Sequence, residues 1–387
     1  MKWSTAFTVG GLVAVLAAGG SCPLAAAPAG EARKPSKLFD PGDGWFDISA
    51  FLDESYGFAP ILMPVTEPAL GYGVAGALVF IDKQPSLPGA GYRQPDLAAV
   101  GGLVTENANW GAAGLDSRHW RNDRLQTIVA AGYAELHLDY YGLGEDSELR
   151  NHPLSYSLSP AGGQAQVKHR LGKSRFQVGL AYALAEVRVE FGAGDGAQGI
   201  PPFEADTWQA GLTPSANYDS RNNLFTPTRG IYAEALCRVF SQALGGDADH
   251  QRAELVWIGY HPLHPKVTVG AKVAGRASFG EVPFYMRPYV SLRGLAALSY
   301  QGEQVAEAEA EVRYQFWKRI SLVGFGGAGS AWSGSDGEES RKNVQTAGTG
   351  VRYELARKYG LHMGLDVAWG PDLSAIYVQF GNAWMRL

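Results

Sequence analysis

The sequence has little charge, almost no cysteine and no long apolar run in its body. Charged residues make up 18% of the 387 positions and the formal net charge is −5, which argues against a disordered chain and a strongly basic nucleic-acid-binding protein. Two cysteines exclude a disulfide framework. Beyond residue 30 no apolar run reaches the roughly 18 residues of a transmembrane helix. The chain is instead rich in glycine and aromatic residues, a profile that points to β-structure.

The first 30 residues have the features of a secretory signal peptide. Lys2 supplies the positive start, residues 9–18 form an apolar stretch too short to anchor the chain, and small residues follow at 25–29. A lipoprotein signal ending at Cys22 is the weaker alternative, because the usual leucine is missing ahead of this cysteine. Both alternatives predict an exported protein.

Residues 31–56 are predicted to form a periplasmic linker followed by a short amphipathic helix. Proline and glycine punctuate the first half of this segment, as is typical of a linker. In residues 45–54, Trp45, Ile48 and Phe51 fall on one side of a helix. Because this helix directly precedes the first strand, we expect it to close the periplasmic mouth of the domain that follows.

The remaining residues, 57–387, alternate between apolar and polar side chains at the period of a β-strand. In residues 305–316, for example, glutamates occupy one face and alanine, valine and aromatic residues the other. Many such segments run for about 10–15 residues, longer than the roughly 5–6 of soluble strands, whereas about 9–11 tilted residues cross a bilayer. The pattern therefore predicts an all-β fold, a transmembrane antiparallel barrel with lipid outside and a polar lumen.

The turn signals divide this region into sixteen strands, an even number as bacterial barrels require. The predicted strands begin near Phe58, Ala69, Asp96, Trp110, Leu125, Leu154, Ser174, Thr207, Ile231, His250, Lys266, Gln304, Ile320, Val344, Leu361 and Ser374. The connections alternate between short and long, which predicts short periplasmic turns and longer outer loops. The first strand contains two prolines and is the least regular of the sixteen.

Three stretches of the sequence contain recognisable motifs. Residues 217–230 read NYDSRNNLFTPTRG. This stretch resembles the strand–turn–strand signature of the BamA/TamA outer-membrane assembly superfamily, the bacterial surface antigen domain. The matching positions include Tyr218, Asp219, Arg221, Pro227, Arg229 and Gly230. Arg293 and Gly294 stand where the family has an Arg-Gly pair on its longest loop, and residues 310–332 resemble its last conserved hairpin.

The resemblance implies an outer-membrane location in a Gram-negative bacterium and a loop that folds into the barrel lumen. The best-known family members also carry periplasmic POTRA domains. Residues 31–56 are fewer than the roughly 50 of a small folded domain, so we expect a member without them.

The family often has an aspartate on the thirteenth strand that receives the loop arginine, but Gly327 occupies that position here. An arginine lowered into a lumen needs a carboxylate, because an unpaired buried charge is expensive. We hypothesise that Arg293 pairs with Glu311, with Glu309 or Asp366 as neighbours. The alternative is that these acids only line a wet lumen.

By resemblance, the expected activity is insertion or translocation of a protein or lipid client. The alternatives are a passive pore or structural barrel, and a lipid-modifying hydrolase. Glu135, His137 and Asp139 would share the lumenal face of residues 125–140 and could form an acid–base site, but no Gly-x-Ser-x-Gly elbow accompanies them. We therefore predict no enzyme activity.

No cofactor or metal is predicted. Two glycine-rich segments, 71–76 and 324–329, have dinucleotide-binding spacing but lack the helix that such a site needs. The predicted partners are outer-membrane lipids and an unknown client, without nucleic acid, and a homodimer stays open.

Overall fold

The computed structural model describes residues 38–50, 59–82, 96–142, 149, 152–191, 203–335 and 338–386. The predicted signal peptide lies outside these residues, as do Phe51 to Glu54 of the predicted amphipathic helix. Within the described part, no helix is long and apolar enough to span a membrane.

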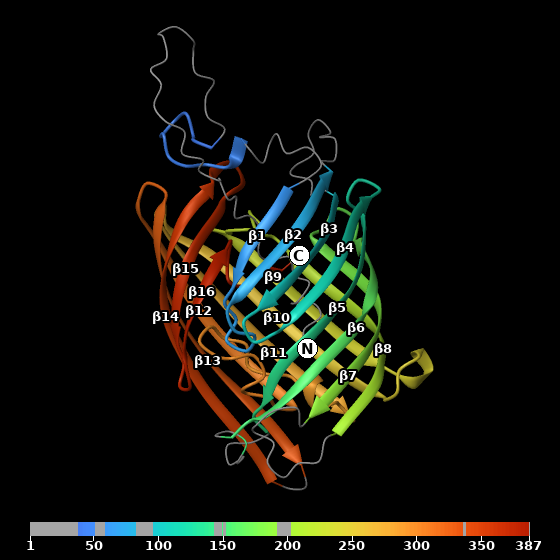
Figure 1. The fold of residues 1–387 in the computed structure, drawn as a ribbon. Coiled ribbons are helices and arrows are strands. Elements are labelled where there is room, and N and C mark those ends of the chain that lie inside the picture. Colours follow the sequence, from blue (N-terminus) through green and yellow to red (C-terminus); the bar gives the residue numbers. More distant parts are fainter. Residues whose placement is uncertain are drawn as a thin grey trace, which may run out of the picture.

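The chain forms one antiparallel sheet of sixteen strands in sequential order, curled into a barrel (Figure 1). The strands are β1 (Ala59–Val65), β2 (Gly73–Asp82), β3 (Asp96–Thr105), β4 (Trp110–Trp120), β5 (Leu125–Tyr140), β6 (Leu154–Arg170), β7 (Phe176–Phe191), β8 (Phe203–Asp219), β9 (Gly230–Phe240), β10 (His250–His264), β11 (Val267–Gly280), β12 (Gln304–Trp317), β13 (Ile320–Ser335), β14 (Glu338–Ala356), β15 (Leu361–Trp369) and β16 (Ser374–Phe380). The predicted barrel and its strand number are confirmed. Strand β2 begins later than predicted, because Leu70 and Gly71 donate backbone hydrogen bonds to the Glu67 carbonyl in a turn.

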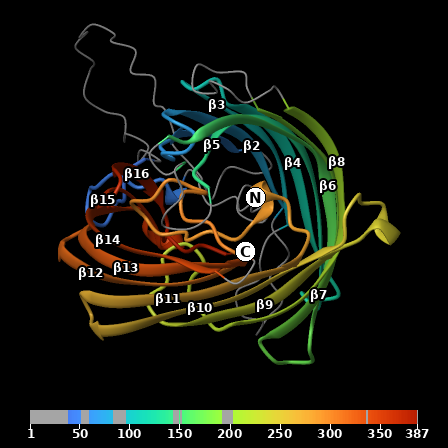
Figure 2. The ribbon, with the colours of Figure 1, turned by 90° about the horizontal axis from the view of Figure 1, so that it is seen from below.

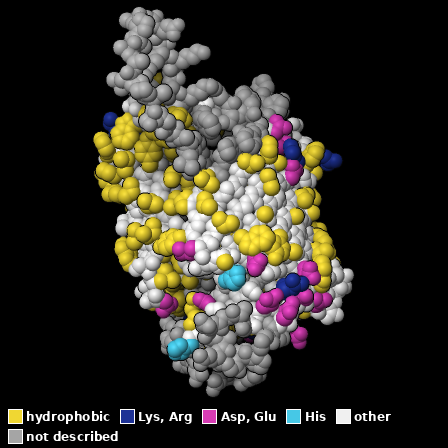
Figure 3. All heavy atoms as spheres, in the orientation of Figure 1, with side chains coloured by type: hydrophobic (Ala, Val, Ile, Leu, Met, Phe, Trp, Pro, Cys, Tyr) yellow, Lys and Arg dark blue, Asp and Glu magenta, His cyan; other side chains and the backbone are white. Residues whose placement is uncertain are grey.

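Alternation along each strand separates an outer face from a lumenal face. On β10, Leu255 is 63% exposed whereas Ile258, on the opposite face, is 1% exposed. Apolar side chains spread over the outer wall, and charged ones gather near its two ends (Figure 3). This distribution suits a wall that meets lipid, because aliphatic and aromatic side chains outside a barrel have no other partner.

The predicted alternation of short turns and long loops holds only in part. Strands β3 and β4, β13 and β14, and β15 and β16 are joined by two to four residues at the end where long connections were predicted, whereas ten residues join β8 to β9 at the other end. Strands β4 and β5, β10 and β11, and β12 and β13 are joined by connections of two to four residues at what we call the short-turn end. The connection between β11 and β12, residues 281–303, starts at the opposite, long-loop end and folds into the ring of strands (Figure 2). We call residues 281–303 the lumenal segment. Its side chains Val290, Leu292 and Leu295 are buried.

The short-turn end of the lumen is also filled. The connection between β8 and β9 reaches across it, where Asn223 Nδ2 donates to the Tyr359 carbonyl at 2.8 Å. The chain after β16 turns inward beside this connection, and Asn382 Nδ2 donates to the Phe225 carbonyl at 2.8 Å. Further along, Trp384 Nε1 lies 3.2 Å from Glu309 Oε2 on β12. The described lumen is therefore filled by protein from both ends.

Candidate functional site

The first and last strands meet at a seam without a hydrogen-bonded ladder. No backbone pairing joins β1 to β16 among the described residues. One hydrogen bond crosses the boundary, from Val378 N to Thr66 Oγ1 at 3.3 Å. Pro60 and Pro64 lie on β1, and proline has no backbone N–H to offer a neighbouring strand. The seam thus leaves two strand edges able to pair with another strand.

The lumenal segment places Arg293 among the three predicted carboxylates. Arg293 Nε donates to Glu309 Oε1 at 2.6 Å, and Nη1 donates to Asp366 Oδ2 at 2.9 Å. Arg293 Nη2 also lies 2.9 Å from Glu311 Oε2. The guanidinium stacks over Phe325 on β13, 3.5 Å from the ring centroid, a favourable cation–π arrangement. Phe325 and three acids from two strands thus surround this arginine.

The glycine at position 327, where the resemblance leads us to expect an aspartate, has a structural explanation. A Cβ on Gly327 would lie 2.9 Å from Leu292 and 3.3 Å from Glu309 Cγ. Bare backbone at this position therefore leaves room for the lumenal segment and for the glutamate. Asp366 is held from a second side by Arg352, whose Nη2 donates to Oδ2 at 2.8 Å, so its charge is shared between two arginines.

Gly294 connects the lumenal segment to the last hairpin. Its φ is +94°, in the left-handed region, and a Cβ there would lie 3.0 Å from the Trp369 carbonyl carbon. Its N–H donates to the Tyr377 hydroxyl on β16 at 3.0 Å. The Arg-Gly pair therefore links the β12 and β15 carboxylates to a seam strand.

We expect Gly294→Ala to lower the free energy of unfolding by about 1–3 kcal/mol, because a side chain in this conformation is strained and its Cβ would press on the β15–β16 turn. Urea unfolding in lipid vesicles, followed by tryptophan fluorescence, measures the change. Gly324→Ala is the control, since a Cβ there meets nothing within 4 Å. Equal effects of the two changes would contradict this role for Gly294.

The predicted strand–turn motif surrounds the short-turn end of β8 and β9. Arg221 pairs with Asp219 at 2.7 Å, lies over the Tyr232 ring and donates to the Arg386 carbonyl at 2.9 Å. Gly230 has φ +104° and approaches the Ser220 carbonyl too closely for a Cβ. The other three positions of the motif differ in their burial and contacts. Pro227 is buried, Arg229 is exposed, and Tyr218 packs on Phe176 with ring centroids 4.9 Å apart.

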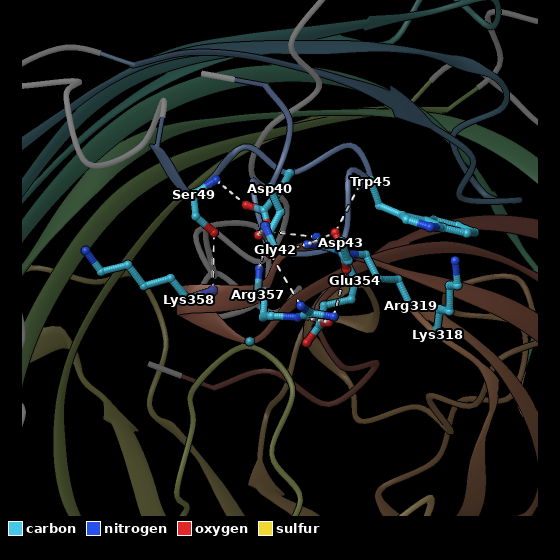
Figure 4. A network of polar contacts seen from close by, with 12 residues as sticks. Asp40, Gly42, Asp43, Trp45, Ser49, Lys318, Arg319, Glu354, Arg357 and Lys358 are labelled. Carbon is cyan, nitrogen blue, oxygen red and sulfur yellow. Dashed lines mark hydrogen bonds and ion pairs between the residues drawn. The ribbon is translucent and has the colours of Figure 1, made fainter. Parts of the chain in front are cut away.

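A second ionic cluster holds the segment that precedes the barrel. We call residues 38–50 the strap. Arg319, in the turn between β12 and β13, is 0% exposed and binds three strap aspartates (Figure 4). The distances are 2.6 Å from Nη2 to Asp40, 2.8 Å from Nε to Asp43 and 2.6 Å from Nη1 to Asp47. Arg357, on the neighbouring β14–β15 turn, also pairs with Asp40 and Asp43.

The apolar side of the strap touches both ends of the sheet. Ile48 is buried in a cluster with Val79 of β2 and with Leu355 and Leu361 of β14 and β15, and Met63 of β1 packs against it. The Ile48 N–H donates to the Leu355 carbonyl at 3.0 Å. The strap therefore connects β1 and β2 with β14 and β15 at the short-turn end, the two groups of strands that flank the seam.

The predicted helix over residues 45–54 is not confirmed. Phe46 forms a β-bridge with Phe39, and Asp47 N donates to the Leu38 carbonyl, so Trp45 to Ile48 are not helical. The apolar residues at helical spacing contact different parts of the barrel instead of forming one helix face. Ile48 enters the cluster while Trp45 stacks on Tyr353, with ring centroids 6.1 Å apart.

We expect the strap to dissociate from the barrel below about pH 4. The hydrogen bond from Arg319 lowers the pKa of Asp43 to about 2. Burial opposes the charge on Asp47, but hydrogen bonds from Ser49 and Arg319 outweigh burial and lower its pKa as well. Because both carboxyls have a lower pKa when docked, their contribution is complete above the ordinary value of about 4 and is lost as the pH falls toward 2.

A nitroxide label on Ala50 would report this dissociation by its line shape in electron paramagnetic resonance. The label should stay immobile from pH 8 to 5 and become mobile between pH 4 and 2. In an Arg319→Ala background it should be mobile throughout, and a pH midpoint near 6 would contradict the assignment to the aspartates.

The predicted lumenal placement of Glu135, His137 and Asp139 is wrong. His137 is exposed and Leu138, its neighbour, faces the lumen. The inward positions of β5 are even-numbered, so the three polar residues continue the outer face that carries Val129. The proposed acid–base trio therefore does not face the lumen. Within the described ranges, no group of three or more His, Cys, Asp or Glu side chains is placed to hold a metal.

Sequence reasoning missed the strap cluster. The signals were three aspartates within eight residues and a single arginine on a two-residue turn. The distance of some 270 positions between Arg319 and the aspartates leaves no local pattern to detect.

Comparison with known proteins gives both a family and a fold. The model of the Omp85 superfamily domain matches residues 112–371. The structure of BamA from Haemophilus ducreyi lacking POTRA domains 1–3 is similar, with a TM-score of 0.58 at 13% identity, over 84% of this chain and 69% of that one. CdiB from Escherichia coli gives 0.56 at 10%, over 83% and 61%. No curated protein matches the sequence.

Proposed function

We propose, because this chain belongs to the Omp85 superfamily, that it inserts or translocates a protein client at the bacterial outer membrane. The superfamily barrel and the likeness to BamA and CdiB support this location and class of activity. Family members of this kind move clients rather than catalyse reactions, so we propose no enzyme activity. A lipid client is the alternative cargo.

The observation that carries the proposal is the seam. An unpaired strand edge binds another strand through main-chain hydrogen bonds, whatever the side chains of that strand. Both β1 and β16 offer such an edge, since the one hydrogen bond between them in the described structure uses the Thr66 side chain. We propose that a client strand pairs at this edge on its way into the membrane.

A passive pore is less well supported. The lumenal segment, the β8–β9 connection and the chain after β16 fill the described lumen. In this proposal, Arg293 and Gly294 hold the lumenal segment against β12, β15 and β16, and the strand–turn motif holds the chain after β16 through Arg221. The domain order would be a cleaved signal at 1–30, a linker at 31–56 and the barrel at 57–387.

A reversible disulfide bond across the seam tests the proposal. Thr66→Cys and Val378→Cys, in a Cys237→Ser background, place two thiols where the single seam hydrogen bond lies. We expect vesicles with the unmodified or reduced protein to accelerate insertion of a urea-unfolded eight-stranded outer-membrane barrel, measured by its heat-modifiable gel mobility. Oxidation should reduce the rate to that of protein-free vesicles, and reductant should restore it.

The control is a disulfide bond between cysteines that replace Ala271 and Ala310, which face each other on the paired strands β11 and β12. This disulfide bond should leave the insertion rate unchanged. Full activity of the oxidised seam variant would rule out the seam as the insertion site, and no acceleration by the unmodified protein would rule out insertion of protein clients.

A further inference from the structure

A group of cations lies at the short-turn end of β4 to β7. They occupy the β4–β5 turn, the last residue of β6 and the β6–β7 turn: Arg121, Arg124, Arg170, Lys173 and Arg175. We call these residues the basic rim. All of them are exposed except Arg170, which is half-buried. The acid in these turns is Asp123, so the basic rim has a surplus of positive charge.

The acids on neighbouring strands are engaged with other cations. Asp116 on β4 pairs with Arg118 at 2.8 Å, and Asp219 on β8 pairs with Arg221 at 2.7 Å. The strap aspartates bind Arg319 on the β12–β13 turn. The strap thus offsets positive charge on another part of the short-turn end and leaves the basic rim cationic.

Backbone hydrogen bonds place the two turns of the basic rim side by side. Arg170 N donates to the Arg124 carbonyl at 2.8 Å, so the end of β6 lies directly against the β4–β5 turn. Leu171 N donates to the Phe176 carbonyl at 3.0 Å and closes the β6–β7 turn. The cations therefore form one continuous surface.

Apolar side chains adjoin this surface on the outer wall of the barrel. Trp120, Leu171 and Phe176 are 51%, 46% and 51% exposed. Aromatic side chains at the ends of transmembrane strands lie at the level of the lipid headgroups. Cations next to them are placed to meet lipid phosphates, and basic clusters at a membrane surface attract anionic lipids.

The backbone of the β4–β5 turn does not explain its first arginine. Arg121, Asn122 and Asp123 have φ of +52°, +58° and +61°, in the left-handed region where glycine and asparagine are least strained. What Arg121 adds to the turn is therefore its charge. Arg121→Asn removes this charge and keeps a residue that suits the backbone.

We propose that the basic rim binds the phosphate groups of anionic phospholipids, such as phosphatidylglycerol, in the leaflet at the short-turn end. Guanidinium groups form strong charge-assisted hydrogen bonds with phosphate oxygens, and Trp120 and Phe176 would contact the upper part of the acyl chains. The inference rests on the proposed membrane location but does not depend on insertion of a client.

Quenching of a bimane label by brominated lipids in phosphatidylcholine vesicles tests the proposal. The label is attached to Val178→Cys in a Cys237→Ser background, because Val178 is the third residue of β7 and is 41% exposed on the outer face. Brominated phosphatidylglycerol should associate beside the label at least about fivefold more strongly than brominated phosphatidylcholine, the factor that one cation supplies at an anionic membrane surface.

Neutralising the basic rim should remove this preference. The variant combines Arg121→Asn, Arg124→Gln, Lys173→Gln and Arg175→Gln, and heat-modifiable gel mobility shows that it is folded. About 1 M NaCl should also remove the preference, because it shortens the Debye length to about 3 Å. Arg188→Gln, which changes an exposed arginine on the outer face far from these turns, should leave it intact.

Leu322→Cys provides the matched control position, since Leu322 is the third residue of β13 and is 44% exposed. A label there should show a smaller preference, because the strap offsets the charge of the neighbouring turn. Equal quenching by the two lipids at Val178, a preference kept in the folded four-site variant, or an equal preference at Leu322 would overturn the proposal. Loss of the preference in inorganic phosphate at constant ionic strength would overturn it too, since the free anion would then be the ligand.

Discussion

Arg293→Ala is expected to lower the free energy of unfolding by about 3–5 kcal/mol, the usual cost of removing one partner from a buried ionic cluster. The change leaves Glu309 and Glu311 without their arginine and Asp366 with Arg352 alone. It also removes the stacking on Phe325. Urea unfolding in vesicles measures the loss, and a reduced yield of folded barrel should accompany it.

Two variants make this prediction specific to the buried charge. Arg188→Ala removes an exposed arginine that pairs with Asp206 on the outer face and should change stability by less than about 1 kcal/mol. Arg293→Gln with Glu309→Gln removes one charge of each sign and should recover part of the loss. If Arg293→Ala costs no more than Arg188→Ala, the lumenal cluster does not stabilise the barrel.

Arg319→Ala is expected to release the strap, with a loss of roughly 2–4 kcal/mol in its docking free energy. Arg319 alone contacts all three strap aspartates, and removing it leaves partly buried carboxylates with few other partners. The Ile48 amide, bonded to Leu355, should exchange its hydrogen roughly 30- to 1,000-fold faster, since 1.4 kcal/mol is tenfold. Hydrogen-exchange mass spectrometry of the strap peptide measures this.

Arg357→Ala is the matched control for the strap. Arg357 contacts Asp40 and Asp43 as Arg319 does, but its side chain is 47% exposed, so solvent screens its ion pairs and the loss should stay below about 1 kcal/mol. Comparable acceleration of exchange in the two variants would show that net charge, and not the buried geometry, docks the strap.

The barrel was predictable because its pattern is local. Each strand has one face for lipid and one for the lumen, so alternation alone locates it. The same rule explains the error on β5. Val129 and Glu135 share the outer face, but polarity alone assigned Glu135 to the lumen. Polarity distinguishes the outer face of a strand from its lumenal face only where the outer face contacts lipid, because beyond the bilayer both faces can carry polar side chains.

For the Arg293 site, the sequence predicted the type of partner but not the geometry. Inward-facing carboxylates on the twelfth and fifteenth strands made an ionic partner for Arg293 foreseeable. The shared geometry was not, because it depends on how the lumenal segment folds back against Phe325. The strap is the clearest case. Trp45 and Ile48 have helical spacing, yet contacts with Arg319 and Leu355, far along the chain, hold an extended backbone.

The lengths of the strands have a consequence for the surrounding bilayer. Strands β1 and β16 have seven residues each, against nineteen in β14. Seven residues extend about 23 Å along the strand, less than the roughly 30 Å of the hydrocarbon core. Lipids beside these two strands must compress or tilt to cover a shorter apolar wall, a hydrophobic mismatch that has a free-energy cost for each ångström. In the proposed outer-membrane location, we therefore expect the membrane next to β1 and β16 to be thinner and less ordered than elsewhere around the barrel.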